Sequence, residues 1–286
     1  MEHKKIIKYS IVLGIIITSS FVAKWYWQQS TAEYATVAVL DVGQGDAIYI
    51  RSVSGQDILI DGGPDRKVLE QLGKQMPFWD RTIELMVLTH PHADHINGLI
   101  TLFDYYQVKQ VLLTKLNREH DPTYQAFLTQ IKKQASQVQY AQANDIIQLG
   151  NNEQLNIIYP FANTLLDNIE NLNDTSIILD YQFGEHNILL TGDASVELEQ
   201  QLINNQKLFD IDILKVGHHG SKYSSSEAFL QAIKPELAVL SVGTGNSFGH
   251  PAPEALQRLK NSEILRTDQL GDIVFHVTTA DIDLIR

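Results

Sequence analysis

The sequence predicts an α/β fold of four layers, an αββα sandwich of two mixed sheets with helices outside, preceded by one N-terminal transmembrane helix. Apolar strand runs alternate with helical segments throughout residues 31–286. No Pro-rich or Ser-rich linker and no repeat divides this part of the chain. We therefore expect a membrane segment in residues 1–30 and one domain in residues 31–286.

The first 30 residues have the pattern of a membrane anchor. Lysines up to Lys8 precede the uncharged, apolar residues 9–23, and Lys24 begins an aromatic belt. The uncharged run is shorter than the about 20 residues of a comfortable span, but both flanking lysines can extend to the interface, so residues 6–22 can serve. A cleaved signal peptide is the alternative, although residues 21–23 form a poor cleavage site. Because the lysines come first, we expect a single-pass protein of the cell membrane with an extracellular catalytic domain, or alternatively a secreted protein.

Apolar runs and turn signals predict the elements of the domain in order. Strands are expected at 36–40, 47–50, 57–60, 83–88, 110–113, 146–149, 155–159, 176–179, 187–190, 211–216, 237–242 and 273–277. Helices are expected at 66–75, 99–106, 122–135, 227–233 and 253–259. Asp121 should cap the helix that opens with Pro122.

Composition excludes several kinds of site. The absence of cysteine excludes disulfides, thiolate ligands and a cysteine nucleophile. The formal charge of -12, from 34 acidic and 22 basic residues, disfavours a broad basic face for nucleic acid. Any phosphodiester would have to be held locally, by metal ions.

A cluster of metal-ligating residue types follows the strand at 83–88. His90, His92, Asp94 and His95 lie within six positions, although the chain has only 10 histidines in 286 residues. Imidazole and carboxylate groups suit zinc, manganese or iron. Alternation along an extended turn would separate the first two residues from the last two, which predicts two neighbouring divalent ions, Zn or Mn. A polar loop with incidental histidines is the alternative.

This cluster resembles the H-x-H-x-D-H signature of the metallo-β-lactamase fold. Four further motifs occur in the expected order, at residues 40–47, 59–63, 190–193 and 214–221, and together they resemble the ComEC-type subfamily. That subfamily is the metallo-β-lactamase-like domain of the competence DNA-uptake channel, also found as freestanding proteins. The resemblance covers about residues 35–286 and implies a metal-dependent hydrolase with the four-layer sandwich of that fold.

The resemblance also suggests roles for residues outside the cluster. Asp193 is implied to bridge the two ions. Asp61 is expected to orient the histidine loop by hydrogen bonding rather than to bind a metal. Asn173 stands where many members of the fold have a third histidine, so the first ion should be held with more oxygen and water. Asp174 could substitute as a ligand, although a solvated loop aspartate is the preferred interpretation.

A pair of histidines follows the strand at 211–216. One of them should complete the second ion's site, and we expect this to be His218, the first of the pair. His219 would then contact the substrate or act as a general acid, and Asp94 would orient the nucleophile while binding metal.

Two further segments are candidates for substrate contact. Ser221, Lys222, Ser224 and Ser225 lie at the apparent start of the helix at 227–233, where free amides, hydroxyls and one lysine could bind an anion. Lys222 could also act in catalysis, by binding or protonating the departing group. Simple N-capping is the alternative. The resemblance places His250 near the cleft, where it could donate a proton to a phosphate or leaving oxygen; a surface histidine is equally compatible with the sequence.

Three functions compete. The favoured one is a phosphodiesterase or nuclease that acts on DNA, or another phosphodiester, at the cell surface during DNA uptake. The second is an amide or lactone hydrolase. The third is a non-catalytic, metal-stabilised module that docks on a competence channel.

Overall fold

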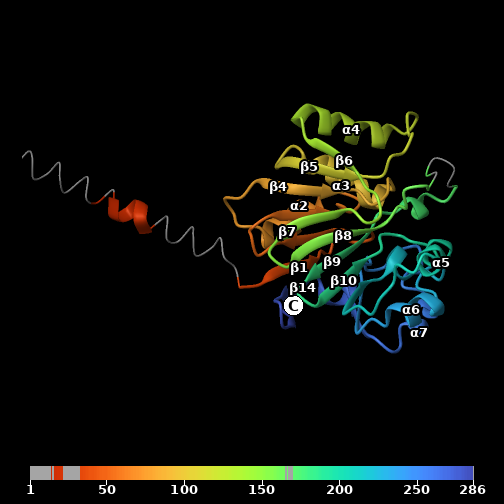
Figure 1. Ribbon diagram of the computed structural model, residues 1–286. Helices are drawn as coiled ribbons and strands as arrows, with labels where there is room; N and C mark the ends of the chain where they lie inside the picture. The colour runs from red at the N-terminus through yellow and green to blue at the C-terminus, as the bar shows by residue number, and fades with distance from the viewer. Residues whose placement is uncertain (1–13, 15, 22–32, 165, 167–169, 286) are drawn as a thin grey trace, which may run out of the picture.

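Two mixed β-sheets packed face to face form the centre of the molecule (Figure 1). The computed structural model describes residues 14, 16–21, 33–164, 166 and 170–285. One sheet has eight strands in the order β15-β14-β1-β2-β3-β4-β5-β6, and the other has seven in the order β13-β12-β11-β10-β9-β8-β7.

The bounds of the elements are as follows. The strands of the first sheet are β1 (Ala35–Val39), β2 (Ile48–Arg51), β3 (Asp57–Ile60), β4 (Thr82–Val87), β5 (Gln107–Leu113), β6 (Gln137–Tyr140), β14 (Ile273–Val277) and β15 (Ile282–Leu284). The strands of the second are β7 (Ile146–Gly150), β8 (Glu153–Tyr159), β9 (Ile178–Phe183), β10 (His186–Leu190), β11 (Ile213–Lys215), β12 (Leu237–Leu240) and β13 (Glu263–Arg266). The helices are α2 (Lys67–Gln75), α3 (Ala93–Leu102), α4 (Pro122–Gln134), α5 (Val196–Asn204), α6 (Glu227–Ile233), α7 (Pro253–Arg258) and α8 (Thr267–Leu270), with short 3-10 helices η2 (Leu172–Thr175) and η3 (Gly217–Gly220).

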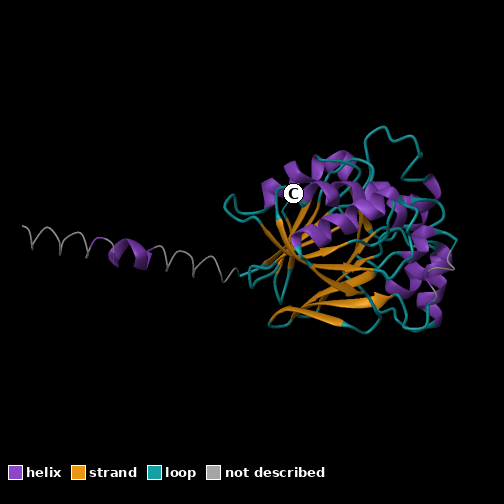
Figure 2. Cartoon of the chain, turned by 90° about the horizontal axis from the view of Figure 1, so that it is seen from above, coloured by secondary structure: helices purple, strands orange, loops and turns teal. Residues whose placement is uncertain are grey.

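The layers follow from strands that are apolar on both faces. Along β1, Val37 and Val39 point into the core between the sheets, whereas Ala38 points to the layer under α2, α3 and α4. On the second sheet, Ile213 faces the inter-sheet core and Leu214 faces α5 and α6. Figure 2 shows the helices lying outside the strands. The predicted four-layer sandwich is therefore confirmed.

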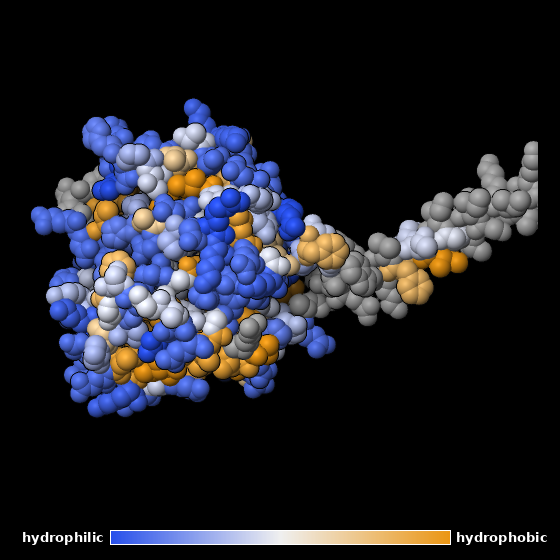
Figure 3. Space-filling view, turned by 180° about the vertical axis from the view of Figure 1, so that it is seen from behind, coloured by the Kyte–Doolittle hydropathy of each residue, from blue (hydrophilic) through white to orange (hydrophobic). Residues whose placement is uncertain are grey.

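Polar residues predominate on the face of the molecule drawn in Figure 3. Figure 3 shows one face on which hydrophilic side chains surround smaller apolar patches. This agrees with a domain in which apolar side chains form three buried clusters.

The parallel strands at the centre of each sheet bring the predicted site residues to one edge. β3 and β4 are parallel in the first sheet, and β10 and β11 are parallel in the second. Asp61 follows β3, His90 follows β4, Asp193 follows β10 and His219 follows β11. Because loops at the carboxyl ends of parallel strands share an edge, four motifs distant in sequence converge there.

Some elements differ from the prediction. The helix expected at 99–106 begins at Ala93, because the polar end of the histidine motif forms its first turn. β6, α5, β13 and β15 were not predicted. β6 lies at a sheet edge with mostly exposed side chains, so its sequence lacks the apolar alternation of a buried strand.

The predicted transmembrane helix is not tested by this structure. Within the described residues, no helix combines the length and apolar character needed to cross a bilayer. Residues 6–22 lie mostly outside the described ranges.

Candidate metal centre

The histidine motif spans the end of β4 and the first turn of α3. His92 has an extended conformation (φ -76°, ψ 151°) and is the N-cap residue of α3, which places Asp94 and His95 in the first helical turn. A carboxylate there is favoured by the positive end of the helix dipole. His90 and His92 therefore leave the strand end, whereas Asp94 and His95 project from a helix.

Close backbone contact fixes the position of α3. A Cβ on Gly98 would lie 1.8 Å from the carbonyl oxygen of Gly62. A Cβ on Gly45 would lie 2.2 Å from the carbonyl oxygen of Asp94, and the φ of Gly45 is +143°. Glycine is thus required where the loops after β1 and β3 meet the helix that carries Asp94.

Four side chains form one group of possible ligands. Asp94, His95, Asp193 and His219 each offer one atom, and these atoms lie within 4.8 Å of one another. His219 Nε2 is 3.4 Å from Asp94 Oδ2 and 3.6 Å from Asp193 Oδ1, and His95 Nε2 is 3.4 Å from Asp193 Oδ2. These contacts converge on a common point.

The buried atoms of this group lack hydrogen-bond partners. They are the Nε2 atoms of His95 and His219 and the Oδ1 atom of Asp193. Buried polar groups without partners are uncommon, and a nitrogen and oxygen donor set of this kind fits a divalent metal ion. The residues present therefore fit the cofactor predicted from the sequence.

A second group shares one carboxylate with the first. His90, His92 and Asp193 also bring their ligand atoms within 4.8 Å of one another, and His90 Nε2 is 3.8 Å from Asp193 Oδ2. Burial, and then the neighbouring His95, hold the pKa of His90 well below its usual value. His90 is therefore neutral, which is the form that binds metal.

Both aspartates of the first group are ionised. Burial opposes ionisation of Asp193, but His219 and His95 hold its pKa well below the usual range. Burial also opposes ionisation of Asp94, but the contact with His219 and the charge of His95 lower its pKa to about 2. The same carboxylates hold the pKa of His95 and of His219 above its usual value, so a divalent ion bound here would displace a proton from each of these rings.

The structure places the two histidines after β11 in the reverse of their predicted positions. Both have positive φ, 49° for His218 and 55° for His219, so the chain turns sharply in η3. The His219 side chain is 2% exposed and joins the group of four. The His218 side chain is 27% exposed at the rim, with Nε2 4.0 Å from Asp193 Oδ2.

Asp61 contacts both ends of the histidine loop. Its Oδ2 is 2.7 Å from His95 Nδ1, and its Oδ1 accepts a hydrogen bond from the Thr89 amide at 2.8 Å. Such a partner fixes the ring orientation of His95 and leaves Nε2 facing the cluster.

The groups behind His219 were missed by sequence reasoning. His219 Nδ1 is 3.0 Å from the Ser241 carbonyl oxygen, its hydrogen-bond partner, and 3.3 Å from Asp46 Oδ1. Asp46 Oδ2 accepts a hydrogen bond from Lys215 Nζ at 2.7 Å. Burial opposes ionisation of Asp46, but Lys215 and His219 hold its pKa below the usual range. The motifs that contain Asp46 and Lys215 were the available signal, but their pairing depends on the tertiary fold.

A side chain of the protein itself occupies the anion site that the sequence predicts at the start of α6. The carboxylate of Glu199, which is buried, accepts hydrogen bonds from the amides of Ser225 and Ser226. Ser224 is buried and donates to the Gly217 carbonyl at 2.7 Å. The free amides expected there are thus satisfied by the chain itself.

The neighbouring residues likewise do not form the expected anion site. Ser221 is buried, and its Oγ accepts a hydrogen bond from the Tyr223 amide at 3.2 Å. Lys222 is exposed, and its Nζ lies 5.0 Å from the centre of the Tyr223 ring. The predicted substrate contacts of Ser221 and Ser224 do not fit these positions.

His250 and Asn173 lie beside the histidine pair. The His250 ring is 5.5 Å from that of His218, and burial together with both histidines of the pair lowers its pKa to about 4. Asn173 Nδ2 is 3.4 Å from both ring nitrogens of His218, and Asn173 Oδ1 is buried without a partner. Asp174 instead accepts from the Ser195 amide at 3.2 Å and belongs to neither group.

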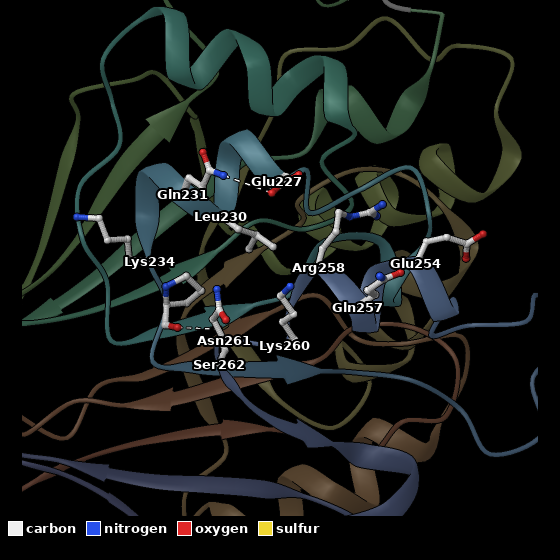
Figure 4. Close-up of a pocket in the computed structure, with 11 residues that line it drawn as sticks. Glu227, Leu230, Gln231, Lys234, Glu254, Gln257, Arg258, Lys260, Asn261 and Ser262 are labelled. Atoms are coloured by element: carbon white, nitrogen blue, oxygen red, sulfur yellow. Dashed lines mark hydrogen bonds between the residues drawn. The ribbon is translucent and has the colours of Figure 1, made fainter.

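A groove of about 810 Å³ lies between α6 and α7 (Figure 4). Glu227 lines it from α6, Lys234 lines it from the position after that helix, and Arg258 lines it from α7. Arg258 donates hydrogen bonds to the carbonyls of Ser224 at 2.7 Å and Ser225 at 2.8 Å, which ties α7 to the loop after η3. No residue of the two candidate ligand groups lines this groove.

Comparison with known proteins agrees with this geometry. A family model described as the metallo-beta-lactamase superfamily matches residues 40–244. ComE operon protein 3 of Bacillus subtilis (strain 168) is 28% identical over 294 residues, which cover 96% of this chain and 37% of that protein. Competence protein ComA of Neisseria gonorrhoeae is 39% identical over 108 residues, which cover 36% of this chain and 15% of that protein. These matches confirm the resemblance identified from the motifs, although the chain spans well under half of either relative.

A solved structure shows the same fold. The metallo-beta-lactamase fold protein YhfI from Bacillus subtilis has a TM-score of 0.57 to this chain at 13% sequence identity. The match covers 85% of this chain and 100% of that one.

Proposed function

Because the chain belongs to the metallo-beta-lactamase superfamily, we propose that it is a hydrolase with two divalent ions that cleaves a phosphodiester. The observation that carries this proposal is the position of Asp193, which belongs to two of the three groups whose possible ligand atoms lie within 4.8 Å of one another; the third group is Asp46, Asp61 and His95. A carboxylate shared by two ligand sets would let Asp193 help to hold two neighbouring divalent ions, as in two-metal hydrolases.

The two groups assign the ligands of each ion. In this proposal one ion is held by Asp94, His95, Asp193 and His219, and the other by His90, His92 and Asp193. Bound divalent ions act as Lewis acids and make water a nucleophile at neutral pH.

The chain's own residues then bind and orient the reactants. The Asp94 side chain is 32% exposed, so its carboxylate can accept a hydrogen bond from the attacking water while it binds metal. His218 and His250 lie at the rim, and His250 is uncharged near neutral pH. His250 can therefore donate a hydrogen bond to the substrate through a ring N–H without adding charge.

Two observations favour a phosphodiester over an amide or lactone. Asn173 stands in place of a third histidine, and the second group contains only two imidazoles and one carboxylate. Fewer nitrogen ligands shift preference toward Mn²⁺ or Mg²⁺, ions that accompany phosphates. One relative is competence protein ComA of Neisseria gonorrhoeae, which supports DNA as the substrate and a competence channel as a partner.

The test is hydrolysis by the purified full chain supplied with Mn²⁺, Zn²⁺ or Mg²⁺. We expect Mn²⁺-dependent cleavage of single-stranded DNA and little hydrolysis of a β-lactam. Asp193→Asn should abolish cleavage, whereas Asp180→Asn, which changes a buried aspartate outside both groups, should leave it intact. Hydrolysis of a β-lactam or lactone with no phosphodiesterase activity would favour the alternative enzyme. Bound metal with no hydrolysis of either class would favour a non-catalytic docking module.

We also propose that residues 1–30 hold the domain at the outer face of the cell membrane. The lysines that precede the apolar run support this orientation. Protease added to intact cells should digest the domain, and full protection until lysis would reverse the orientation. A mature N-terminus near residue 24 would instead indicate a secreted protein.

A further inference from the structure

An exposed aromatic ring lies at the edge of the candidate metal centre. Phe248 is 67% exposed, and its ring lies 6.0 Å from that of His250 with an angle of 25° between the planes. The His250 ring in turn lies 6.4 Å from that of His219. The His250 ring therefore lies between Phe248 and the candidate metal ligand His219.

The loop that carries Phe248 is held by one side chain. Asn246 Nδ2 donates to the carbonyls of Gly243 at 3.0 Å and His250 at 2.6 Å. Asn246 Oδ1 accepts from the amides of Phe248 at 3.1 Å and His250 at 3.0 Å. These four hydrogen bonds fix the backbone on both sides of the ring, so that a ligand stacking on Phe248 would meet a preorganised surface.

The acidic composition of the chain disfavours electrostatic attraction of a polyanion over a broad surface. Its formal charge is -12, and the amides at the start of α6 are already bound by Glu199. Contacts between many basic side chains and phosphates, which dominate most nucleic-acid binding, are therefore not available on a broad face. Stacking of a base on an aromatic ring is a separate source of affinity that depends little on charge and tolerates any base.

We propose that Phe248 binds a nucleobase next to the phosphodiester held at the metal centre. This inference rests on the proposed phosphodiester substrate and narrows it to nucleic acid with unpaired bases. A base inside a duplex is stacked on both faces, whereas a single strand can place one base against an exposed ring. Leucine at this position would keep apolar bulk but lose the aromatic face.

The experiment compares two fluorescein-labelled oligonucleotides of equal length, one of thymidines and one with abasic residues in place of every base. Equilibrium binding to the full chain is measured by fluorescence anisotropy with Ca²⁺, which requires no turnover, and cleavage is measured separately with Mn²⁺. We expect Phe248→Leu to weaken binding of the thymidine oligonucleotide by about tenfold and to leave the abasic one unchanged. In cleavage, KM for the thymidine oligonucleotide should rise with little change in kcat.

Phe248→Trp should retain tight binding, because it preserves a stacking surface. The matched control is Phe78→Leu, which removes a ring that is 79% exposed but precedes β4, at the opposite end of that strand from His90. This control should leave both binding constants unchanged.

The outcomes separate this inference from the proposed function. Equal binding of the two oligonucleotides by the wild type, equal loss for both in Phe248→Leu, or no binding of either would overturn the role of Phe248. Base-dependent binding that Phe248→Leu removes, without cleavage in any metal, would support the inference and refute the phosphodiesterase activity. If the Phe248 ring serves only to dock a protein partner, the wild type should bind the thymidine and abasic oligonucleotides equally.

Discussion

Lys215 Nζ lies 2.7 Å from Asp46 Oδ2, and both side chains are 1% exposed. The other carboxylate oxygen of Asp46 is 3.3 Å from His219 Nδ1. This buried ion pair therefore connects the loop after β1 to the end of β11, directly behind a candidate metal ligand.

Removing one partner of this pair should be costly, because the remaining charge stays buried. We expect Lys215→Met to lower the free energy of unfolding by about 3 kcal/mol, measured by urea denaturation of the metal-free protein. The double variant Asp46→Asn/Lys215→Met should recover part of this loss. Lys234→Met, which breaks an exposed pair with Asp210, should change stability by less than about 1 kcal/mol. Equal effects of the two lysine substitutions would contradict this account.

The two histidines after β11 should differ in their effect on metal binding. His219→Ala removes a member of the four-residue group, so elemental analysis should show about one ion fewer per chain. His218→Ala removes a rim residue and should leave the metal content near that of the wild type. Loss of metal in His218→Ala with retention in His219→Ala would reverse the assignment.

Two helical glycines should respond oppositely to alanine. Gly98→Ala would place a Cβ 1.8 Å from the Gly62 carbonyl oxygen, displace α3, and destabilise the protein by more than about 2 kcal/mol. Gly73, in α2, has no atom within 4 Å of an added Cβ, so Gly73→Ala should stabilise by about 1 kcal/mol. Thermal unfolding of both variants measures this, and similar shifts in Tm would contradict the packing of α3 on the loop after β3.

Part of the fold and part of the candidate site could be predicted from the sequence. The four-layer fold follows from the alternation of apolar strand runs with helical segments, and the convergence of Asp61, His90 and Asp193 follows from their positions at the ends of parallel strands. The sequence could not distinguish His218 from His219, because both adopt a left-handed conformation that residue type alone does not specify. Nor could it show Glu199 bound to the start of α6, since that contact joins segments distant along the chain.

A buried aspartate outside the metal centre should make stability depend on pH. Burial raises the pKa of Asp180 to about 6. The charge of Asp212 also raises this pKa, whereas a hydrogen bond from Asn156 lowers it. A carboxyl whose pKa is higher in the folded state than in the unfolded state favours folding at low pH, and this contribution is lost as the pH rises through about 6. The free energy of unfolding should therefore fall between about pH 4 and pH 6 by on the order of 2 kcal/mol for this group.

Asp180→Asn should remove that part of the pH dependence. Urea denaturation of the metal-free wild type and variant at several pH values measures the difference. A variant with the same slope as the wild type would show that Asp180 titrates normally in the folded protein.

Whether Asp193 binds both ions can be measured by electron paramagnetic resonance of the Mn²⁺-loaded protein. Two Mn²⁺ ions about 3.5–4 Å apart with a common carboxylate should give the spectrum of a spin-coupled pair. We predict this spectrum, with two ions per chain, for the wild type and for Asp180→Asn, and its loss in Asp193→Asn. A single uncoupled ion in the wild type, or an unchanged coupled spectrum in Asp193→Asn, would contradict the account.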